Sequence, residues 1–322
     1  MFEAVVGDDV YAEDPTVNEL EQMAARVVDK EASLFTASGT MSNLLSVLAQ
    51  TQRGDEIIVG SEAHMFWYEV GGASALGGVT LHTVRNEADG TMALPAVEDA
   101  IRSRNIHYPP TTLLCLENTH NRCGGAVLPV EYMAAAGRLA HQHGMRLHVD
   151  GARIFNAAVA LGVSPAELAK GSDSVSFCLS KGLSAPVGSM LCGDRVFVGA
   201  ARKWRKMVGG GMRQAGILAA AGIVALNTQI DRLAEDHRNA QRLSRGLALI
   251  RGITGLAPAP TNIVMFEVAP PVLGSEFLKG MDARGVRLSP RGGQRFRAVT
   301  HRMISTGDVD EALSRIGSFF NA

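Results

Sequence analysis

The chain has 322 residues, of which 46% are hydrophobic and 20% charged, so it can bury a full core and form two domains. Its 31 Lys and Arg residues nearly balance its 32 Asp and Glu residues, and a net charge of -1 gives no overall electrostatic case for binding nucleic acid or an anionic membrane. No segment has the uninterrupted apolar length of a membrane span, and the first residues lack the pattern of a secretory signal.

The four cysteines show no paired spacing, and two of them lie inside apolar runs: Cys115, Cys123, Cys178 and Cys192. This usage is typical of reduced thiols. We therefore expect a cytoplasmic protein.

Strands and helices are predicted to alternate along the first two thirds of the chain. Asp14-Pro15-Thr16 carries a capping residue and a proline suited to a helix start. Helices are expected at 14–30, from about 44, and at 67–76, 95–102, 130–143 and 154–161, and strands at 32–35, 56–59, 79–84, 112–116, 145–149, 174–179 and 188–192. Many of these strands are continuous apolar runs, which indicates burial on both faces and a mostly parallel, doubly wound α/β sheet.

The last third has a different texture. A long helical pattern covers about 212–249, and a segment rich in Gly and Pro follows at 252–260. Strands at 262–268, 286–288 and 295–299 and helices at 274–284 and from 308 complete the chain. We expect a large α/β domain over residues 1–230 and a small α+β domain over residues 231–322.

Lys181 lies where the apolar run 174–179 breaks into small residues. An ammonium at the end of a buried strand is costly unless it is paired or used as an amine nucleophile. The alternative is that its stem reaches solvent.

Other polar residues also follow predicted strands, where open α/β sheets bind their ligands. Ser38-Gly39-Thr40 opens a helix, which suits either a phosphate or a simple N-cap. Asp150 ends a strand in which His148 shares its face, and this carboxylate can pair with a protonated pyridine nitrogen or with Arg153.

Two histidines follow strands as well. His64 precedes an aromatic turn and can stack on a flat ring, move a proton or simply fill the core. His120 lies in the polar loop 117–125, which is either functional or a solvated surface loop. Lys206 and Arg213 flank three glycines, in a basic hinge or an ordinary helix end.

Taken together, these stretches resemble the threonine aldolases of the beta-eliminating lyase group, which are fold-type-I pyridoxal phosphate enzymes. The matching phrases occur in the right order over essentially the whole chain, at 6–15, 38–43, 64–68, 117–121, 148–153, 176–188, 206–214 and 299–301.

The resemblance implies a role for each singled-out residue. Lys181 would form the internal aldimine, Asp150 would pair with the pyridine nitrogen, and His64 would stack on the ring. The phosphate would be held by Ser38, Gly39 and Thr40. Arg153 would lie close to the ring and the substrate.

Arg297 falls where the family has an arginine that grips the substrate carboxylate with a two-pronged head. Arg291 and Arg295 are rivals for that role.

The resemblance further implies retro-aldol cleavage of L-threonine or L-allo-threonine to glycine and acetaldehyde. A base removes the β-hydroxyl proton, and His64 and His120 are the candidates. Lys206 and Arg213 would approach a neighbouring subunit's site in a homotetramer built as a dimer of dimers. No metal, nucleic acid or membrane partner is expected.

One departure concerns the first residues. Family members usually have a short segment like Leu-Arg-Ser-Asp-Thr-Val-Thr ahead of the phrase at 6–15, and its serine helps to bind the substrate carboxylate. Nothing here matches it. We expect a weakened substrate pocket with an intact cofactor site.

Two other functions compete with the aldolase. A β-elimination lyase acting on aromatic or sulfur amino acids would share Lys181, Asp150 and Arg297. A homologue that binds the cofactor but has little activity is the second alternative.

Overall fold

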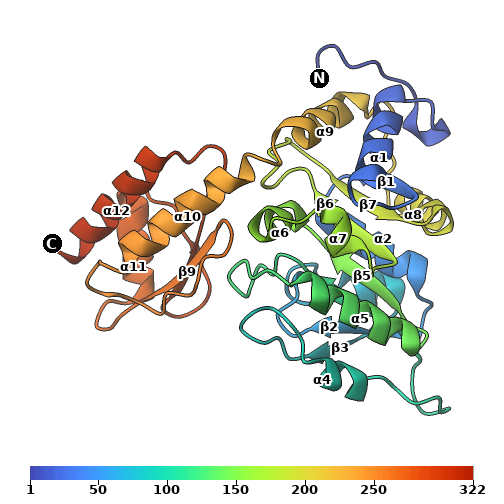
Figure 1. The fold of residues 1–322 in the computed structure, drawn as a ribbon, viewed down its shortest axis with the longest axis horizontal. Coiled ribbons are helices and arrows are strands. Elements are labelled where there is room, and N and C mark those ends of the chain that lie inside the picture. The colour runs from blue at the N-terminus through green and yellow to red at the C-terminus, as the bar shows by residue number, and fades with distance from the viewer. Residues whose placement is uncertain (322) are drawn as a thin grey trace.

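The computed structural model describes residues 1–321 and contains a seven-stranded and a four-stranded β-sheet, which lie at opposite sides of Figure 1. The larger sheet has the order β1-β7-β6-β5-β4-β2-β3. Its strands are β1 (Ala32–Thr36), β2 (Glu56–Gly60), β3 (Thr80–Val84), β4 (Thr111–Glu117), β5 (Arg146–Asp150), β6 (Ser174–Cys178) and β7 (Ser189–Gly193). All neighbours are parallel except β7, which runs antiparallel to both β1 and β6.

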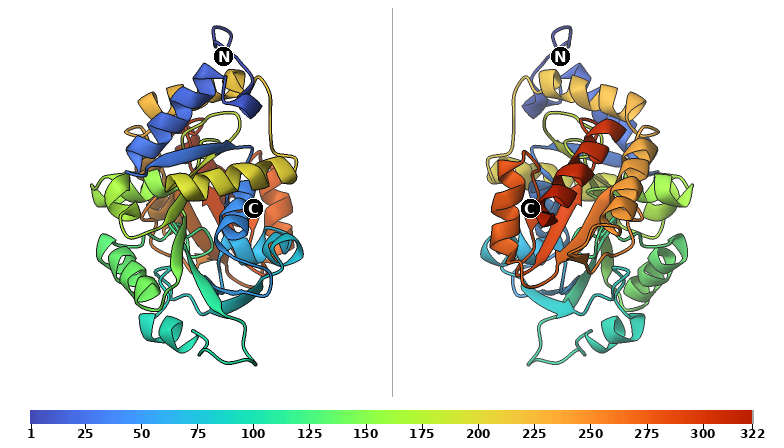
Figure 2. Two further views of the ribbon diagram at one scale, coloured as in Figure 1. Left: turned by 90° about the vertical axis from the view of Figure 1, so that its right-hand side faces the viewer. Right: turned by 90° about the vertical axis from the view of Figure 1, so that its left-hand side faces the viewer.

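Helices connect the parallel strands and cover both faces of the larger sheet, because parallel neighbours need a crossover connection. They are α1 (Pro15–Val27), α2 (Gly39–Gln50), α3 (His64–Trp67), α4 (Leu94–Asp99), α5 (Val130–Gln142), α6 (Ile154–Leu161), α7 (Pro165–Ala169), α8 (Arg195–Met207) and α9 (Gly216–Thr228). Helices α1 and α9 are far apart in the sequence but pack side by side near the N-terminus (Figures 1 and 2). Short helical turns, η1 (Asp9–Tyr11) and η2 (Ala73–Gly77), complete this part.

Alternate residues of the central strands enter different cores. Ile58 of β2 and Leu114 of β4 join the cluster made with α1, α5, α6 and α9. Their neighbours Ile57 and Leu113 join the cluster that includes Val47 of α2. Burial on both faces explains why these strands appear in the sequence as continuous apolar runs.

The smaller sheet is antiparallel throughout, with the order β10-β11-β9-β8. Its elements are β8 (Ile253–Thr254), β9 (Ile263–Val268), β10 (Ser289–Pro290), β11 (Arg295–Val299), α10 (Leu233–Leu247), α11 (Gly274–Ala283) and α12 (Thr306–Phe320). It has its own core, in which Phe266, Phe277 and Phe296 pack together.

Helix α10 joins the two parts. Leu233 at its start lies in the core of the larger sheet, whereas Leu243 and Leu247 lie in the core of the smaller one. Its His237 Nε2 accepts a hydrogen bond of 3.0 Å from Asn156 Nδ2 of α6. One helix therefore contributes to both cores.

Most predicted elements are present, but four predictions were wrong. The helix expected at 67–76 is divided into α3 and η2, because Val70 and Gly71 adopt left-handed backbone conformations between them. The long helix at 212–249 is divided into α9 and α10. The segment 252–260 is not only a linker, because β8 lies within it, and the strand predicted at 286–288 occurs at β10 instead.

All four cysteines are free thiols. Within residues 1–321, no single helix is long and apolar enough to cross a membrane, and only α9 and α10 together, bent by 72°, meet that criterion.

Candidate active site

Lys181 lies in the loop that follows β6, at the carboxyl edge of the larger sheet. The loop is closed by backbone bonds from Ser184 to Lys181 and from Ala185 to Leu179. Among residues 1–321, the half-buried Lys181 amine has no hydrogen-bond or ion-pair partner. It faces a cavity of about 220 Å³ lined by Ser38, Gly39, Thr40, Asn43, His64, Asp150, Ala152, Cys178, Ser180 and Lys181.

One wall of this cavity is the first turn of α2. Ser38 is the N-cap, and its Oγ accepts a bond of 3.2 Å from Met41 N, so the N-cap interpretation is confirmed. The first N–H groups of a helix have no partner within the helix and favour an anion. A Cβ on Gly39 would lie 2.9 Å from Cys178 Sγ, which explains a glycine here.

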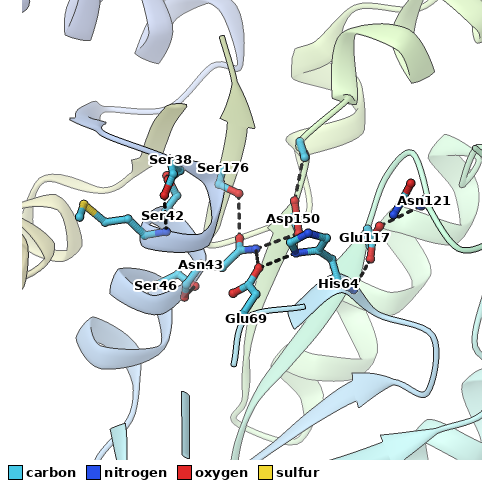
Figure 3. A network of polar contacts seen from close by, with 12 residues as sticks. Ser38, Ser42, Asn43, Ser46, His64, Glu69, Glu117, Asn121, Asp150 and Ser176 are labelled. Carbon is cyan, nitrogen blue, oxygen red and sulfur yellow. Dashed lines mark hydrogen bonds and ion pairs between the residues drawn. The ribbon is translucent and has the colours of Figure 1, made fainter. Parts of the chain in front are cut away.

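The opposite wall carries Asp150, the last residue of β5. Figure 3 shows Asn43 of α2 beside it, and Asn43 Nδ2 donates to Asp150 Oδ2 at 2.8 Å. Asn43 Oδ1 is within 3.0 Å of Ser176 Oγ and 3.2 Å of His148 Nε2. Burial lowers the pKa of His148 to about 4, so this ring is neutral and its Nε2 carries the proton that reaches Asn43. Asp150 forms no ion pair with Arg153 in the described chain.

His64 is held by a second carboxylate, Glu69. The Nδ1 atom of His64 lies 2.8 Å from Glu69 Oε1, which also accepts a bond of 2.8 Å from Asn43 Nδ2 (Figure 3). The hydrogen bond to Glu69 raises the pKa of His64, while burial raises the pKa of Glu69. Because Glu69 accepts a hydrogen bond from Nδ1–H, the Nε2 atom of the neutral ring carries no proton and keeps a free lone pair.

His64, Glu69 and Asp150 each have a nitrogen or oxygen atom that could ligate a metal, and these atoms lie within 4.8 Å of one another. Asn43 donates to both carboxylates and His64 donates to one of them. Hydrogen bonds therefore account for this cluster.

Glu117, the last residue of β4, links His64 to the following loop. Its Oε2 accepts from His64 N at 2.7 Å and its Oε1 accepts from Asn121 N at 2.8 Å (Figure 3). Asn121 Oδ1 in turn accepts a bond from Arg297 Nη1 of β11. A continuous polar chain thus connects the smaller sheet to His64.

His120 is buried in the same loop and does not line the cavity. Its Nδ1 accepts a bond of 3.4 Å from Cys123 N, which leaves the proton of the neutral ring on Nε2. This Nε2 is buried and has no partner among the described residues.

Three arginines, Arg153, Arg291 and Arg297, belong to the same region. Burial lowers the pKa of Arg153, and burial followed by the charges of Arg291 and Arg153 lowers the pKa of Arg297 to about 10. Arg295, a rival in the sequence, is exposed and pairs with Glu267 at 3.1 Å.

Lys206 and Arg213 do not join the cavity. Lys206 is exposed in the last turn of α8. Arg213 is exposed, pairs with Asp8 at 2.6 Å and lies over the Tyr11 ring. Neither residue lines the cavity of its own chain.

Asn43, Glu69 and Glu117 were given no role on the basis of sequence. Asn43 follows Gly39 by four residues, so helical spacing could have placed it on the same face as the N-terminal turn. For Glu69 no signal exists, because the turn that brings it back to His64 is not helical.

The cavity fits pyridoxal phosphate: an unpartnered amine, a carboxylate for the ring nitrogen and a helix N-terminus for the phosphate surround it. Together, the mostly parallel sheet and this site define a fold-type-I pyridoxal phosphate enzyme.

The chain belongs to the beta-eliminating lyase family, whose model matches residues 1–270. It is 50% identical over 247 residues to the low specificity L-threonine aldolase of Escherichia coli strain K12, covering 77% of this chain and 73% of that protein. It is 45% identical over 320 residues to the low-specificity L-threonine aldolase 1 of Arabidopsis thaliana, covering 98% and 89%.

Solved structures show the same fold. The threonine aldolase of Leishmania major superposes with a TM-score of 0.82 at 18% identity, covering 96% of this chain and 91% of that one. The serine palmitoyltransferase of Sphingomonas wittichii superposes with a TM-score of 0.76 at 17% identity, covering 98% and 79%. Both the predicted fold class and the predicted cofactor are confirmed.

Proposed function

We propose that this enzyme cleaves L-threonine or L-allo-threonine into glycine and acetaldehyde, with pyridoxal phosphate attached to the amine of Lys181. The observation that carries the proposal is the cavity itself, which collects Lys181, Asp150 and Ser38 to Thr40 from three separate parts of the chain. The names of the relatives from Escherichia coli and Arabidopsis thaliana support the same reaction.

The residues divide the work of holding the cofactor. The first N–H groups of α2 and the hydroxyls of Ser38 and Thr40 would bind the phosphate. Asp150, fixed by Asn43, would pair with the ring nitrogen, and His64 would pack against the ring. When bound, pyridoxal phosphate supplies an electron sink for the electron pair of the broken Cα–Cβ bond.

Arg297 and Arg153 hold the α-carboxylate of the substrate. Neither takes part in an ion pair within residues 1–321, and Arg297 Nε is buried without a partner there. A planar guanidinium suits a two-pronged bond to a carboxylate. Holding this group orients the bond to be broken.

The protonation of the two histidines favours His64 as the base. Its Nδ1–H donates a hydrogen bond to Glu69, so the unprotonated Nε2 can accept the β-hydroxyl proton. His120 has the opposite arrangement, with Nε2 as a donor. We therefore assign proton removal to His64 and hydrogen-bond donation to His120.

The reaction is tested by incubating the pyridoxal phosphate-loaded enzyme with L-threonine and L-allo-threonine and measuring glycine and acetaldehyde. Equal amounts of the two products are expected. Pyruvate and ammonia from a panel of amino acids, with no acetaldehyde, would instead favour β-elimination.

The role of Lys181 has its own test. Borohydride reduction of the loaded protein should fix the cofactor mass on the peptide that contains Lys181, and Lys181→Ala should abolish this labelling. Labelling that persists in the variant would refute the assignment.

We further propose a division into domains at about residue 230 and a homotetramer in which Lys206 and Arg213 reach a neighbouring subunit's site. The separate hydrophobic cores support the division. The second point is supported by the absence of Lys206 and Arg213 from the residues that line the cavity of their own chain. The cytoplasmic location and the effect of the N-terminal segment stay predictions.

A further inference from the structure

Arg291 lies near the candidate active site, and the proposed function assigns it no ligand. It lies between β10 and β11, and within residues 1–321 none of the ion pairs includes Arg153, Arg291 or Arg297. A single α-carboxylate can offset the charge of one guanidinium, and the proposed function assigns it to Arg297 and Arg153. Arg291 is then left without an anionic partner among the described residues.

Arg291 is anchored on the larger sheet by Tyr68. Its Nη1 donates to Tyr68 Oη at 2.9 Å, and its Cζ lies 5.8 Å from the centre of the Tyr68 ring. The Nε of Arg291 is buried and has no partner in the described chain. A buried N–H without an acceptor is costly, which points to an acceptor that arrives with a ligand.

Tyr68 carries a second unused donor. Its hydroxyl oxygen accepts N–H groups from Arg122 at 2.8 Å and from Arg291, so both lone pairs are occupied and the hydroxyl proton is free to bind a ligand. Arg122 itself is already paired with Glu62 and lies over Trp67 at 4.2 Å. Arg122 therefore positions Tyr68. The guanidinium of Arg291 has no carboxylate partner in the described chain and can bind an anionic ligand.

The position of this pair relates it to one end of the substrate. The rings of Tyr68 and His64 are 5.3 Å apart, and His64 is the group assigned to the β-hydroxyl. Through Tyr68, Arg291 therefore lies near the ring assigned to the β-hydroxyl, whereas Arg297 is hydrogen-bonded to Asn121 and reaches only the backbone of His64, through Glu117.

We propose that Arg291 and Tyr68 form a subsite for an anionic group on the β-carbon of the substrate. The substrate class is that of β-hydroxy-α-amino acids with a β-carboxylate, for which β-hydroxyaspartate is the smallest member. This inference rests on the proposed retro-aldol reaction. The Cα–Cβ bond breaks, the β-hydroxyl proton leaves to the base, Cα gains a proton, and the products are glyoxylate and glycine.

The test compares two substrates of equal size, β-hydroxyaspartate and β-hydroxyasparagine, by the rate of glycine formation. A charge-assisted bond predicts that kcat/KM for the acid exceeds that for the amide by about tenfold to a hundredfold. Arg291→Met, which keeps the length of the stem, should reduce this ratio to about one. Arg291→Lys, which keeps the charge, should retain part of the preference.

Arg295→Met is the matched control, because Arg295 is a nearby surface arginine paired with Glu267. It should leave the ratio unchanged. An independent readout is inhibition of threonine cleavage by L-aspartate and L-asparagine, which lack the hydroxyl. Aspartate should inhibit more strongly in the unmodified enzyme, and Arg291→Met should remove the difference.

The outcomes separate this inference from the proposed function. If no β-hydroxy amino acid is cleaved, the proposed function fails. If threonine is cleaved but the acid has no advantage over the amide, the anionic subsite is refuted. If the advantage survives in Arg291→Met, its assignment to Arg291 is refuted.

Discussion

At the scale of single residues, Asn43 determines how the buried charges of the site coexist. Glu69 and Asp150 would repel each other in a dry environment, and Asn43 donates one N–H to each of them. Its oxygen is satisfied by Ser176 and His148. One amide thus fixes two buried carboxylates, one of which also holds His64.

Replacing Asn43 by alanine should leave both carboxylates without this donor. We expect the free energy of unfolding to fall by about 2–3 kcal/mol, because unsatisfied buried groups are expensive. Urea denaturation measures this loss, and titration with pyridoxal phosphate should show weaker binding. Ser46→Ala removes a buried hydroxyl of the same helix that bonds only to a backbone oxygen, and its loss should stay below about 1 kcal/mol. Equal losses in the two variants would contradict the role of Asn43.

Glu69 should control the pH at which the enzyme becomes active. Its hydrogen bond raises the pKa of His64, so the neutral base is lost as the pH falls through this raised value. Glu69→Gln removes the negative charge, lowers the pKa of His64 and should shift the acidic limb of the kcat/KM profile to lower pH.

The matched control for this experiment is Glu62→Gln. Glu62 is a nearby carboxylate that pairs with Arg122 and does not contact His64. This variant should leave the acidic limb in place. An acidic limb that does not move in Glu69→Gln would show that another group controls it.

The sequence was informative about residues that follow strands and poorly informative about their partners. Lys181, Asp150 and Ser38 could be selected because the topology of an α/β sheet brings strand ends together. Asn43 and Asp150 are 107 positions apart, and nothing in either local pattern predicts their bond. Lys206 and Arg213 raise the opposite problem, because their predicted site lies on another copy.

At the scale of elements, local patterns gave the strands well and the interruptions of helices poorly. The helix predicted at 67–76 has apolar residues at helical spacing, but α3 ends at Trp67 and the left-handed conformations of Val70 and Gly71 prevent its continuation. Glu69 lies in this interruption, within hydrogen-bond distance of His64. The break that matters most for the site was therefore invisible to periodicity.

Helix α10 carries a pH-sensitive contact between the two parts of the chain. Burial lowers the pKa of His237 from 6.5 to about 4. Below pH 6.5 the unfolded chain binds a proton that the folded chain excludes, so the free energy of unfolding decreases as the pH falls towards 4.

His237→Gln keeps an oxygen that can accept the bond from Asn156 but cannot be protonated in this range. Its melting temperature should fall less between about pH 7 and about pH 5 than that of the unmodified protein. His141→Gln alters a half-exposed histidine that pairs with Asp173 and should not change the slope. Parallel slopes for all three proteins would contradict the contribution of His237.

At the scale of the whole molecule, two arginines beside the smaller sheet contact segments that follow strands of the larger one. Arg297 reaches Asn121, and Arg291 reaches Tyr68, so both cations depend on how the two sheets meet. The sequence allowed us to predict two regions and a substrate arginine. It did not allow us to predict the contacts between the two sheets, because these depend on the path of α10.

The proposed assembly makes a last prediction about sites shared between subunits. If Arg213 acts in a neighbouring subunit, each active site takes Lys181 from one chain and Arg213 from the other. A Lys181→Ala chain can then still supply Arg213, and an Arg213→Ala chain can still supply Lys181. Unfolding and refolding them together should produce mixed dimers with one complete site, and random mixing predicts about a quarter of the unmodified activity. Refolding each variant alone is the control and should give almost none. A mixture no more active than its components would show that Arg213 serves its own chain, where it pairs with Asp8.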